Sequence, residues 1–289
     1  FPIPHPSVAS PSATRAVLAT HRLATKKSLG QHFLIDDNIV GRILDLADLD
    51  GSESVLEVGP GIGTLTVALC EHAAQVVAVE RDEELLPALQ ETTEFCTNLR
   101  VVRDDAVRVD PDELVTPAGP PVALIANLPY AVAATVVLRF FQEIPSLDTA
   151  VVMVQAEVAA RMSAHPGTKD YGAYTIKLRL SAEATGHFGV ARSCFMPPPR
   201  VDSTVIRLDR VTSIPQEIAL ATARTADAAF AQRRKTIRNS IRSVTGVPGE
   251  SIDQALDAAG IDGRRRAETL SVDEFLDLGS KMREYGLLP

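Results

Sequence analysis

The stretch Val55-Leu-Glu-Val-Gly-Pro-Gly-Ile-Gly63 places three glycines directly after a short apolar run. Glycine lets the backbone turn sharply from a strand into a helix and lets a ligand approach it closely. From residue 52 onward, short apolar runs alternate with amphipathic runs. This alternation predicts an α/β fold, with a doubly wound, Rossmann-like sheet that helices cover on both faces.

The apolar runs have the length of buried strands, and the amphipathic runs have the spacing of helices. Strands are predicted at residues 54–58, 76–80, 99–103, 122–126 and 150–154, and helices at 64–72, 82–92, 131–141 and 157–164. Residues 184–190 and 201–209 predict a closing antiparallel pair. Strand patterns stop after Val211, and helical spacing then predicts a small all-helical domain at 212–289. Its last helix opens with a capping-box pattern, Ser271-x-x-Glu274.

The chain of 289 residues is long enough for one large domain and one small one. Residues 1–25 are rich in Pro, Ser, Ala and Thr and lack periodicity, so we expect a disordered arm before the main domain at 26–211. The three cysteines form no C-x-x-C pair, which indicates neither a disulfide framework nor a zinc site. Polar residues interrupt the apolar run at 122–141. We therefore expect a cytoplasmic, monomeric protein with no metal and no membrane span.

The formal net charge of −8 argues against a nucleic-acid partner, but the charges are unevenly distributed. Residues 230–242 (FAQRRKTIRNSIR) contain five basic residues and no acidic one. On a continuous helix, Phe230, Ile237, Ile241 and Val244 would share one face. The basic residues beside that face predict a phosphate-binding surface made by Arg233, Arg234, Lys235, Arg238 and Arg242. The Lys26-Lys27 arm and Arg264-Arg265-Arg266 are weaker candidates.

Four features of the glycine turn and the following strands favour S-adenosylmethionine over a nicotinamide dinucleotide. The turn is G-P-G-x-G rather than G-x-G-x-x-G, and Glu57 stands two residues before its first glycine. Glu80 ends the second predicted strand, where a carboxylate can bind both ribose hydroxyls. Asp104-Asp105-Ala106 follows the third strand and is placed to bind an adenine amine, with Asp105 as the expected partner.

A second motif, Asn127-Leu128-Pro129-Tyr130, follows the apolar run at 122–126. The amide oxygen of Asn127 can accept a hydrogen bond from an exocyclic amine, and Tyr130 offers a flat face for a base. Pro129 stiffens the turn and has no N–H, so nearby carbonyls can face a ligand. These features suit methylation of an adenine amino group. The same four residues also fit a strand that ends in a proline turn, with Asn as a cap.

Several motifs occur together and in order along the chain. They are Lys27-Ser-Leu-Gly-Gln-His-Phe-Leu34, the glycine turn, Asn127-Leu-Pro-Tyr130, Phe195-x-Pro-x-Pro-x-Val-x-Ser203, Phe230-Ala-Gln-Arg-Arg-Lys235 and Arg266-Ala-Glu-x-Leu270. Over about residues 25–285 the chain resembles the KsgA family of ribosomal RNA adenine dimethyltransferases. The resemblance implies a class I S-adenosylmethionine-dependent methyltransferase with a C-terminal helical domain that binds RNA. The implied reaction is N6,N6-dimethylation of two adjacent adenines in the 3′-terminal hairpin of 16S rRNA in the pre-30S particle, linked to small-subunit maturation.

Matching the motifs also implies roles for single residues. The cofactor contacts would be His32, Leu34, Gly59, Gly61, Glu80, Asp105, Ala106 and Asn127. The catalytic residues would be Asn127, Pro129, Tyr130 and Phe195, with Tyr130 and Phe195 stacking on opposite faces of the base. The chain departs from the family pattern at His32, where Asn is common, and at Ala131, where Asn is frequent.

Two other functions remain open at this point. A resistance-type 23S rRNA adenine N6-methyltransferase shares the fold, although Leu128 and the Gln232-Arg-Arg-Lys235 run favour the small-subunit enzyme. A ribosome-assembly factor could keep the fold without turnover, although Asn127 and Tyr130 argue against this. A nicotinamide oxidoreductase would need pyrophosphate-binding features that the sequence lacks.

Overall fold

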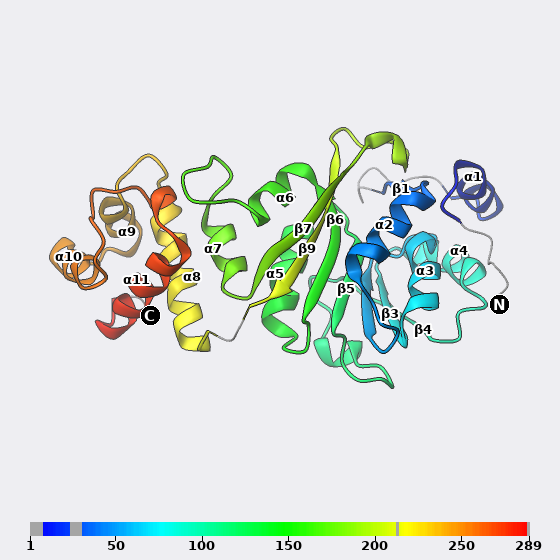
Figure 1. Cartoon of the computed structure of the whole chain (residues 1–289), viewed down its shortest axis with the longest axis horizontal. Helices are drawn as coiled ribbons and strands as arrows, with labels where there is room; N and C mark the ends of the chain where they lie inside the picture. The colour runs from blue at the N-terminus through cyan, green and yellow to red at the C-terminus, as the bar shows by residue number, and fades with distance from the viewer. Residues whose placement is uncertain (1–7, 24–30, 212–213, 288–289) are drawn as a thin grey trace. The chain divides into compact units, whose positions relative to one another are not determined.

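The computed structural model describes residues 8–23, 31–211 and 214–287 of the chain (Figure 1). Contacts within the chain divide it into two compact units. An α/β unit comprises Phe1–Ala159 and Ala184–Arg210, and a helical unit comprises Ala160–Glu183 and Val211–Pro289. No helix in the described part is long and apolar enough to cross a membrane.

The main sheet of the α/β unit confirms the predicted strands. Within the described residues its order is β4-β3-β2-β5-β6-β9-β7. The first five strands in this order are parallel, and β9 runs antiparallel to β6. Their bounds are β2 Ser54–Val58, β3 Gln75–Glu80, β4 Leu99–Arg103, β5 Ala123–Asn127, β6 Thr149–Gln155, β7 Ala182–Val190 and β9 Ser203–Arg210.

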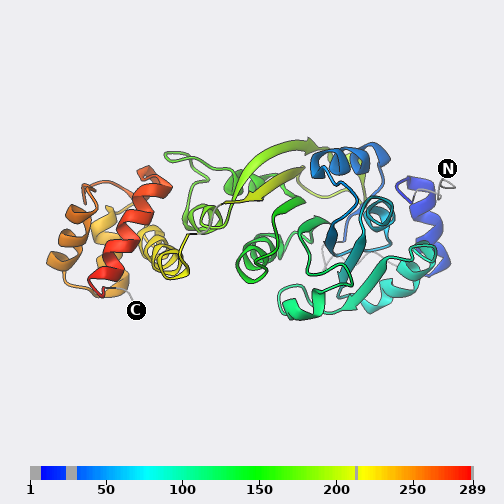
Figure 2. The same ribbon diagram turned by 60° about the horizontal axis from the view of Figure 1, so that its bottom comes forward.

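The strand order reverses between β2 and β5, because the chain adds β3 and β4 on one side and β6 on the other. Loops that leave two such strands diverge, which opens a crevice at their carboxyl ends. Helices α2 and α3 lie on one face of the sheet and α5 on the other (Figures 1 and 2). The helical bounds are α2 Asp37–Ala47, α3 Thr64–His72, η2 Glu83–Leu85, α4 Leu86–Thr92, η3 Pro111–Leu114, α5 Ala133–Glu143, α6 Ala156–Met162 and η4 Arg192–Cys194.

A second, small sheet joins two motifs that are far apart in sequence. Strand β1 (Phe33–Leu34) pairs antiparallel with β8 (Phe195–Met196). Ile35 extends this contact, since its N–H donates to the Cys194 carbonyl at 2.9 Å. The Phe195–Ser203 motif therefore lies beside the Gln31–Leu34 part of the first motif, whose residues 27–30 are outside the described ranges.

The expectation of a wholly disordered N-terminal arm is wrong, because helix α1 occupies Pro11–Thr20. Ser10 caps it by accepting a hydrogen bond from the Ala13 N–H at 3.2 Å, and proline at the first helical position suits a helix start. Its apolar side chains pack on the α/β unit next to Phe33, Ile62 and Leu85. Tertiary packing of this kind has no periodic signal in so short a segment.

The helical unit contains more of the chain than the boundary at residue 211 predicted. Its helices are α7 Ala173–Arg179, α8 Gln216–Phe230, α9 Ile237–Thr245, α10 Gly249–Ala258, η5 Ala267–Thr269 and α11 Val272–Glu284. Tyr171 is fully buried in this core, where its hydroxyl donates to the Leu270 carbonyl at 2.8 Å. Its ring also meets Phe230 edge-on at 6.0 Å. The predicted capping box is confirmed, because Ser271 and Glu274 exchange hydrogen bonds of 2.8 and 3.1 Å.

The continuous helix predicted across residues 230–242 is wrong. Helix α8 ends at Phe230, a turn follows, and α9 begins at Ile237. The Ser240 side chain stabilises this turn, since it donates to the Ala228 carbonyl and accepts from the Gln232 N–H. Arg234 therefore lies in the turn, and Val244 is 54% exposed rather than on the buried face.

Gly63, at the start of α3, offers a test of the glycine turn. An added Cβ would lie 2.7 Å from Thr92 Oγ1, which is held by its hydrogen bond to the Ile62 carbonyl. Gly51 has a similar positive φ, but no described atom lies within 4 Å of its Cβ position. We expect Gly63→Ala to reduce the free energy of unfolding by about 1–3 kcal/mol more than Gly51→Ala, measured by urea unfolding. Equal losses would show that the close packing does not matter.

Candidate active site

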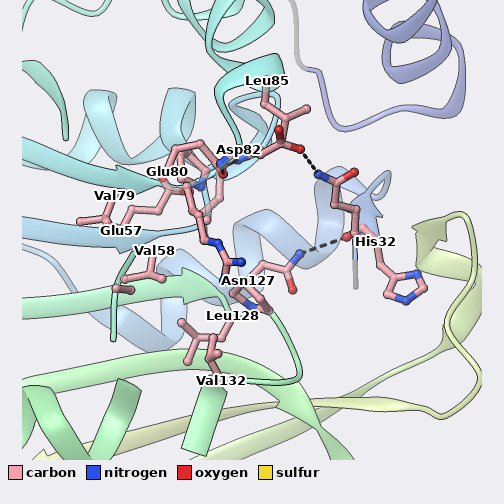
Figure 3. Close-up of a pocket in the computed structure, with 18 of the residues that line it drawn as sticks. His32, Glu57, Val58, Val79, Glu80, Asp82, Leu85, Asn127, Leu128 and Val132 are labelled. Atoms are coloured by element: carbon pink, nitrogen blue, oxygen red, sulfur yellow. Dashed lines mark hydrogen bonds between the residues drawn. The ribbon is translucent and has the colours of Figure 1, made fainter. Parts of the chain in front are cut away.

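A cavity of about 210 Å³ lies at the carboxyl ends of β2, β3, β4 and β5, in the crevice of the strand-order reversal. The side chains of Glu57 and Glu80 enter it from β2 and β3, and Asn127 lies between them and His32 (Figure 3). The structure thus brings together most of the predicted residues: His32, Leu34, Gly59, Gly61, Glu80, Asp105, Ala106, Asn127, Pro129 and Tyr130.

The glycine turn is closely packed on both sides. Gly59, Gly61 and Gly63 have φ values of +70°, +62° and +86°, a region that favours glycine. A Cβ on Gly59 would lie 3.3 Å from the Pro129 ring, and a Cβ on Gly61 would lie 3.3 Å from the Phe33 ring. The turn therefore brings its backbone close to both the Asn127–Tyr130 motif and β1.

Glu80 is a nearly buried carboxylate with a fixed orientation. It accepts hydrogen bonds from the Asp82 N–H at 2.7 Å and the Gly61 N–H at 3.2 Å. Burial raises the pKa of Glu80, while these backbone donors oppose the rise. The carboxylate still has lone pairs that can accept from a pair of ligand hydroxyls.

Glu57 is 1% exposed, and among the described residues its Oε2 has no hydrogen-bond partner. Burial raises the pKa of Glu57 to about 8; the nearby Thr66 hydroxyl opposes the rise, and the Glu80 charge adds to it. An unpartnered buried carboxyl group is costly for the protein alone. It is suited to a ligand that brings a cation or a hydrogen-bond donor into the cavity.

The loop after β4 is held by its own carboxylates and by one arginine. Asp104 accepts from the Asp105 N–H at 2.6 Å, and Asp105 accepts from the Val107 N–H and pairs with Arg81, both at 3.1 Å. Both acids line the cavity. Arg139 of α5 donates to two carbonyls of this loop, at 2.8 and 2.5 Å. Arg139 stands within the apolar run at 122–141, and its sequence position gave no signal of this role.

Asn127 ends β5 with its amide group oriented. Its Nδ2 donates to the His32 backbone carbonyl at 3.3 Å, shown as a dashed line in Figure 3. A carbonyl only accepts, so the nitrogen of the amide must face His32. The Oδ1 atom is then left to accept a hydrogen bond from a ligand.

The structure distinguishes the carbonyls near Pro129. The Pro129 carbonyl itself accepts the N–H groups of Val132 and Ala133, both at 3.1 Å, and so serves the start of α5. The Leu128 carbonyl accepts no hydrogen bond from the described residues. Leu128 therefore has the nearby carbonyl that can face a ligand, while the Pro129 ring packs on Gly59.

Tyr130 is a half-buried ring with both ends supported. Its hydroxyl and the Ser203 hydroxyl share a hydrogen bond of 2.7 Å, and its ring stacks with the His32 ring at 5.4 Å between centroids. Burial raises the pKa of the Tyr130 phenol, so the ring stays neutral at ordinary pH. The geometry agrees with a stacking surface.

Phe195 does not lie where the sequence analysis placed it. It is 2% exposed and belongs to the main hydrophobic cluster, together with Leu34 and Val205. In β8 it pairs with Leu34, so it packs into the core and is absent from the cavity lining. The expected stacking role of Phe195 is therefore wrong.

The sequence did not predict a hydrogen-bonded pair of side chains that lines the cavity near β1. Gln31 Nε2 donates to Asp82 Oδ2 at 2.7 Å, as Figure 3 shows, and Asp82 is 7% exposed. The only available signals were the positions of the two residues, Gln31 beside His32 and Asp82 two residues after Glu80.

The predicted RNA-binding residues fall into two classes. Arg233 pairs with Glu268 at 3.0 Å, and Arg238 makes a two-pronged pair with Asp253 at 2.5 and 2.7 Å. The other three have no ionic partner among the described residues, and all three are exposed. They are Arg234, Lys235 and Arg242. Lys26 and Lys27 lie outside those ranges. The described residues also contain no cluster of metal-ligating side chains.

Comparison with known proteins gives a family match over most of the chain. Residues 22–283 match the family model of the ribosomal RNA adenine dimethylases. The chain belongs to this family.

A relative from Geobacillus thermodenitrificans, ribosomal RNA small subunit methyltransferase A, is 40% identical over 96% of this chain and 98% of its own. A dimethyladenosine transferase from Plasmodium falciparum, solved by crystallography, is 25% identical with a TM-score of 0.75, over 88% of this chain and 98% of its own. The 23S rRNA methyltransferase ErmE is 27% identical with a TM-score of 0.64, over 87% and 99%.

The buried carboxyl of Glu57 predicts a pH dependence of stability in the ligand-free protein. Its pKa is about 8 in the fold and usually 4.5, so between these values the folded protein holds more protons than the unfolded chain. The free energy of unfolding should therefore fall as pH rises through this window, by up to about 1.4 kcal/mol per pH unit from this group.

Glu57→Gln removes this contribution. Urea unfolding at pH 5, 6, 7 and 8 should show wild type losing stability relative to the variant as pH increases. Parallel curves for the two proteins would mean that Glu57 is charged in the folded state.

Proposed function

We propose that this protein transfers methyl groups from S-adenosylmethionine to N6 of two adjacent adenines in the 3′-terminal hairpin of 16S rRNA, during small-subunit maturation. The observation that carries the proposal is the oriented amide of Asn127, whose Oδ1 is left to accept at the cavity that Glu57 and Glu80 also line. Family membership supports the reaction class.

The cavity residues fit this cofactor. The unpartnered Glu57 oxygen suits the amino group of its methionine end, and Glu80 suits the ribose hydroxyls. Asp105 and Ala106, on the loop that Arg139 holds, suit the adenine. When bound, the cofactor supplies a methyl group on a cationic sulfonium, which two buried acidic side chains favour electrostatically.

Asn127 and Leu128 align the target amine in this proposal. The adenine amino lone pair is delocalised into the ring and is a poor nucleophile. Asn127 Oδ1 and the Leu128 carbonyl accept its two hydrogens, which favours a tetrahedral nitrogen with its lone pair aimed at the methyl donor. After the first transfer the methylated nitrogen would carry a positive charge and would lose one proton to water. One N–H then remains, so a single acceptor suffices for the second transfer.

The RNA must present an unstacked base, because a base within a duplex cannot reach a cavity of this kind. Tyr130 provides the stacking surface, fixed by Ser203. We assign phosphate contact in the helical unit to Arg234, Lys235 and Arg242, since Arg233 and Arg238 are engaged in ion pairs. Free cations at a surface are what phosphate binding requires.

The alternatives have weaker support. The Geobacillus thermodenitrificans relative, which is 40% identical to this chain, is named for the small subunit. The 23S enzyme is only 27% identical. A factor without turnover would not need the Asn127 amide held at a cavity with an unpartnered buried acid.

The proposed function is tested by incubating the full chain with labelled S-adenosylmethionine and immature small subunits that lack the modification, and then mapping the methylated adenines. We expect label on two adjacent adenines of the 3′-terminal hairpin. Label in large-subunit RNA alone would contradict the substrate, and no transfer to any RNA would favour an assembly factor.

Asn127→Ala tests the alignment of the amine. We expect kcat to fall about 100- to 1,000-fold, since a preorganised acceptor is lost, with a much smaller change in cofactor affinity. Asn98→Ala is the matched control, because Asn98 also donates to backbone carbonyls, at 2.9 and 3.0 Å, but outside the cavity. Equal turnover by Asn127→Ala and wild type would rule out the proposed alignment.

The three free cations and the paired Arg238 predict different phenotypes. The triple variant Arg234→Gln, Lys235→Gln, Arg242→Gln should bind the small subunit more weakly and reduce the slope of log affinity against log salt by about two to three. Arg238→Gln should lower thermal stability, because it leaves Asp253 unpaired, and should keep the salt slope. An unchanged slope in the triple variant would exclude this surface from RNA binding.

A further inference from the structure

Phe195 is buried in the core and is not available as the predicted second stacking surface for the target base. The His32 ring lies opposite Tyr130 in its place. The His32 and Tyr130 rings face each other with centroids 5.4 Å apart and planes inclined by 30°. Both residues line the cavity, so the pair borders the space where the reacting groups must meet.

Both rings are anchored to one segment of the chain, residues 197–203. His32 Nδ1 lies 2.7 Å from the Pro197 carbonyl oxygen. The Tyr130 hydroxyl shares a hydrogen bond with the Ser203 hydroxyl at the other end of the segment. Because a carbonyl only accepts, the His32 ring has its proton on Nδ1. The facing arrangement of the two rings is therefore supported by one hydrogen bond to each of them.

His32 is also tied to the residue that aligns the amine. Its backbone carbonyl accepts from Asn127 Nδ2 at 3.3 Å (Figure 3). A base stacked on Tyr130 would thus have the His32 ring and the Asn127 amide as close neighbours.

We propose that His32 and Tyr130 form a clamp that receives the target adenine between their rings. This inference rests on the proposed function and adds a base-positioning role for the His32 side chain. Two stacked contacts at ~3.5 Å need roughly 7 Å between the outer rings, which is more than the 5.4 Å between the two centroids, so the rings must move apart. The clamp assigns this movement to the His32 side chain, whose ring is held by a hydrogen bond to the Pro197 carbonyl.

The clamp is tested with His32→Ala and His32→Phe, assayed for methylation of immature small subunits and, separately, for cofactor affinity by calorimetry. His32→Ala should lower kcat/KM for the subunit roughly 5- to 100-fold, the usual effect of losing one base-stacking ring. His32→Phe should restore most of the rate, and in both variants cofactor affinity should change much less than kcat/KM, because the clamp acts on the base.

His72→Ala is the matched control. His72 Nδ1 also donates to a backbone carbonyl, that of Ala68 at 2.8 Å, but the ring lies outside the cavity lining. This variant should methylate like wild type.

A spectroscopic measurement tests the contact directly. The chain contains no tryptophan, so His32→Trp introduces a single indole. Its emission should change when immature subunits bind in the presence of cofactor, because the base stacks on it. A His72→Trp variant should show no change.

Three results would overturn the clamp while leaving the proposed function in place. They are wild-type kinetics for His32→Ala, a rate above wild type for that variant, and unchanged emission of His32→Trp on subunit binding. A rate above wild type would show that His32 obstructs the base. If His32→Ala does not fold, His32→Phe and His32→Trp still decide. Absence of methyl transfer by wild type would instead contradict the proposed function.

Discussion

The packing of the Pro129 ring against Gly59 sets the geometry on which the rest of the site depends. It joins the turn after β2 to the turn after β5 across the point where strand order reverses. A Cβ atom added to Gly59 would lie 3.3 Å from the Pro129 ring. The same contact places the glycine backbone beside Asn127. The carboxylates at the ends of β2 and β3 then lie around one cavity with the amide at the end of β5. In the proposed function, the methyl donor and the amine meet where these two turns approach each other.

The two ends of this cavity differ in their electrostatics. Glu57 and Glu80 are buried close together, and burial raises both pKa values. Such a pair favours a cationic ligand and is costly without one. The Asn127–Tyr130 end is neutral and aromatic, which suits a base. In the helical unit, by contrast, exposed cations remain available despite the net charge of −8. The charge distribution therefore gives more information about function than the total.

The central strands β2, β3, β5 and β6 could be predicted from the sequence because they are buried on both faces and appear as short apolar runs. Glu80 and Asn127 could be predicted as cavity residues because each stands at the end of such a run. The burial of Phe195 could not be predicted, because β8 is two residues long and the side to which the Phe195 side chain points depends on pairing with β1. The partners of Arg233 and Arg238 lie 35 and 15 residues away, so only the fold shows that these cations are engaged. The turn after Phe230 depends on Ser240, whose hydrogen bonds have no sequence pattern. The stack of His32 on Tyr130 is likewise a tertiary contact.

In the proposed function, the Asn127–Tyr130 corner holds the adenine amine in front of the methyl donor. A structure of the full chain on an immature small subunit, with S-adenosylhomocysteine in place of the donor, would show whether it does. We expect one hairpin adenine out of its stack, against the Tyr130 ring, with N6 within about 3.2 Å of both Asn127 Oδ1 and the Leu128 carbonyl. An adenine bound with its N6 away from these two atoms would contradict it.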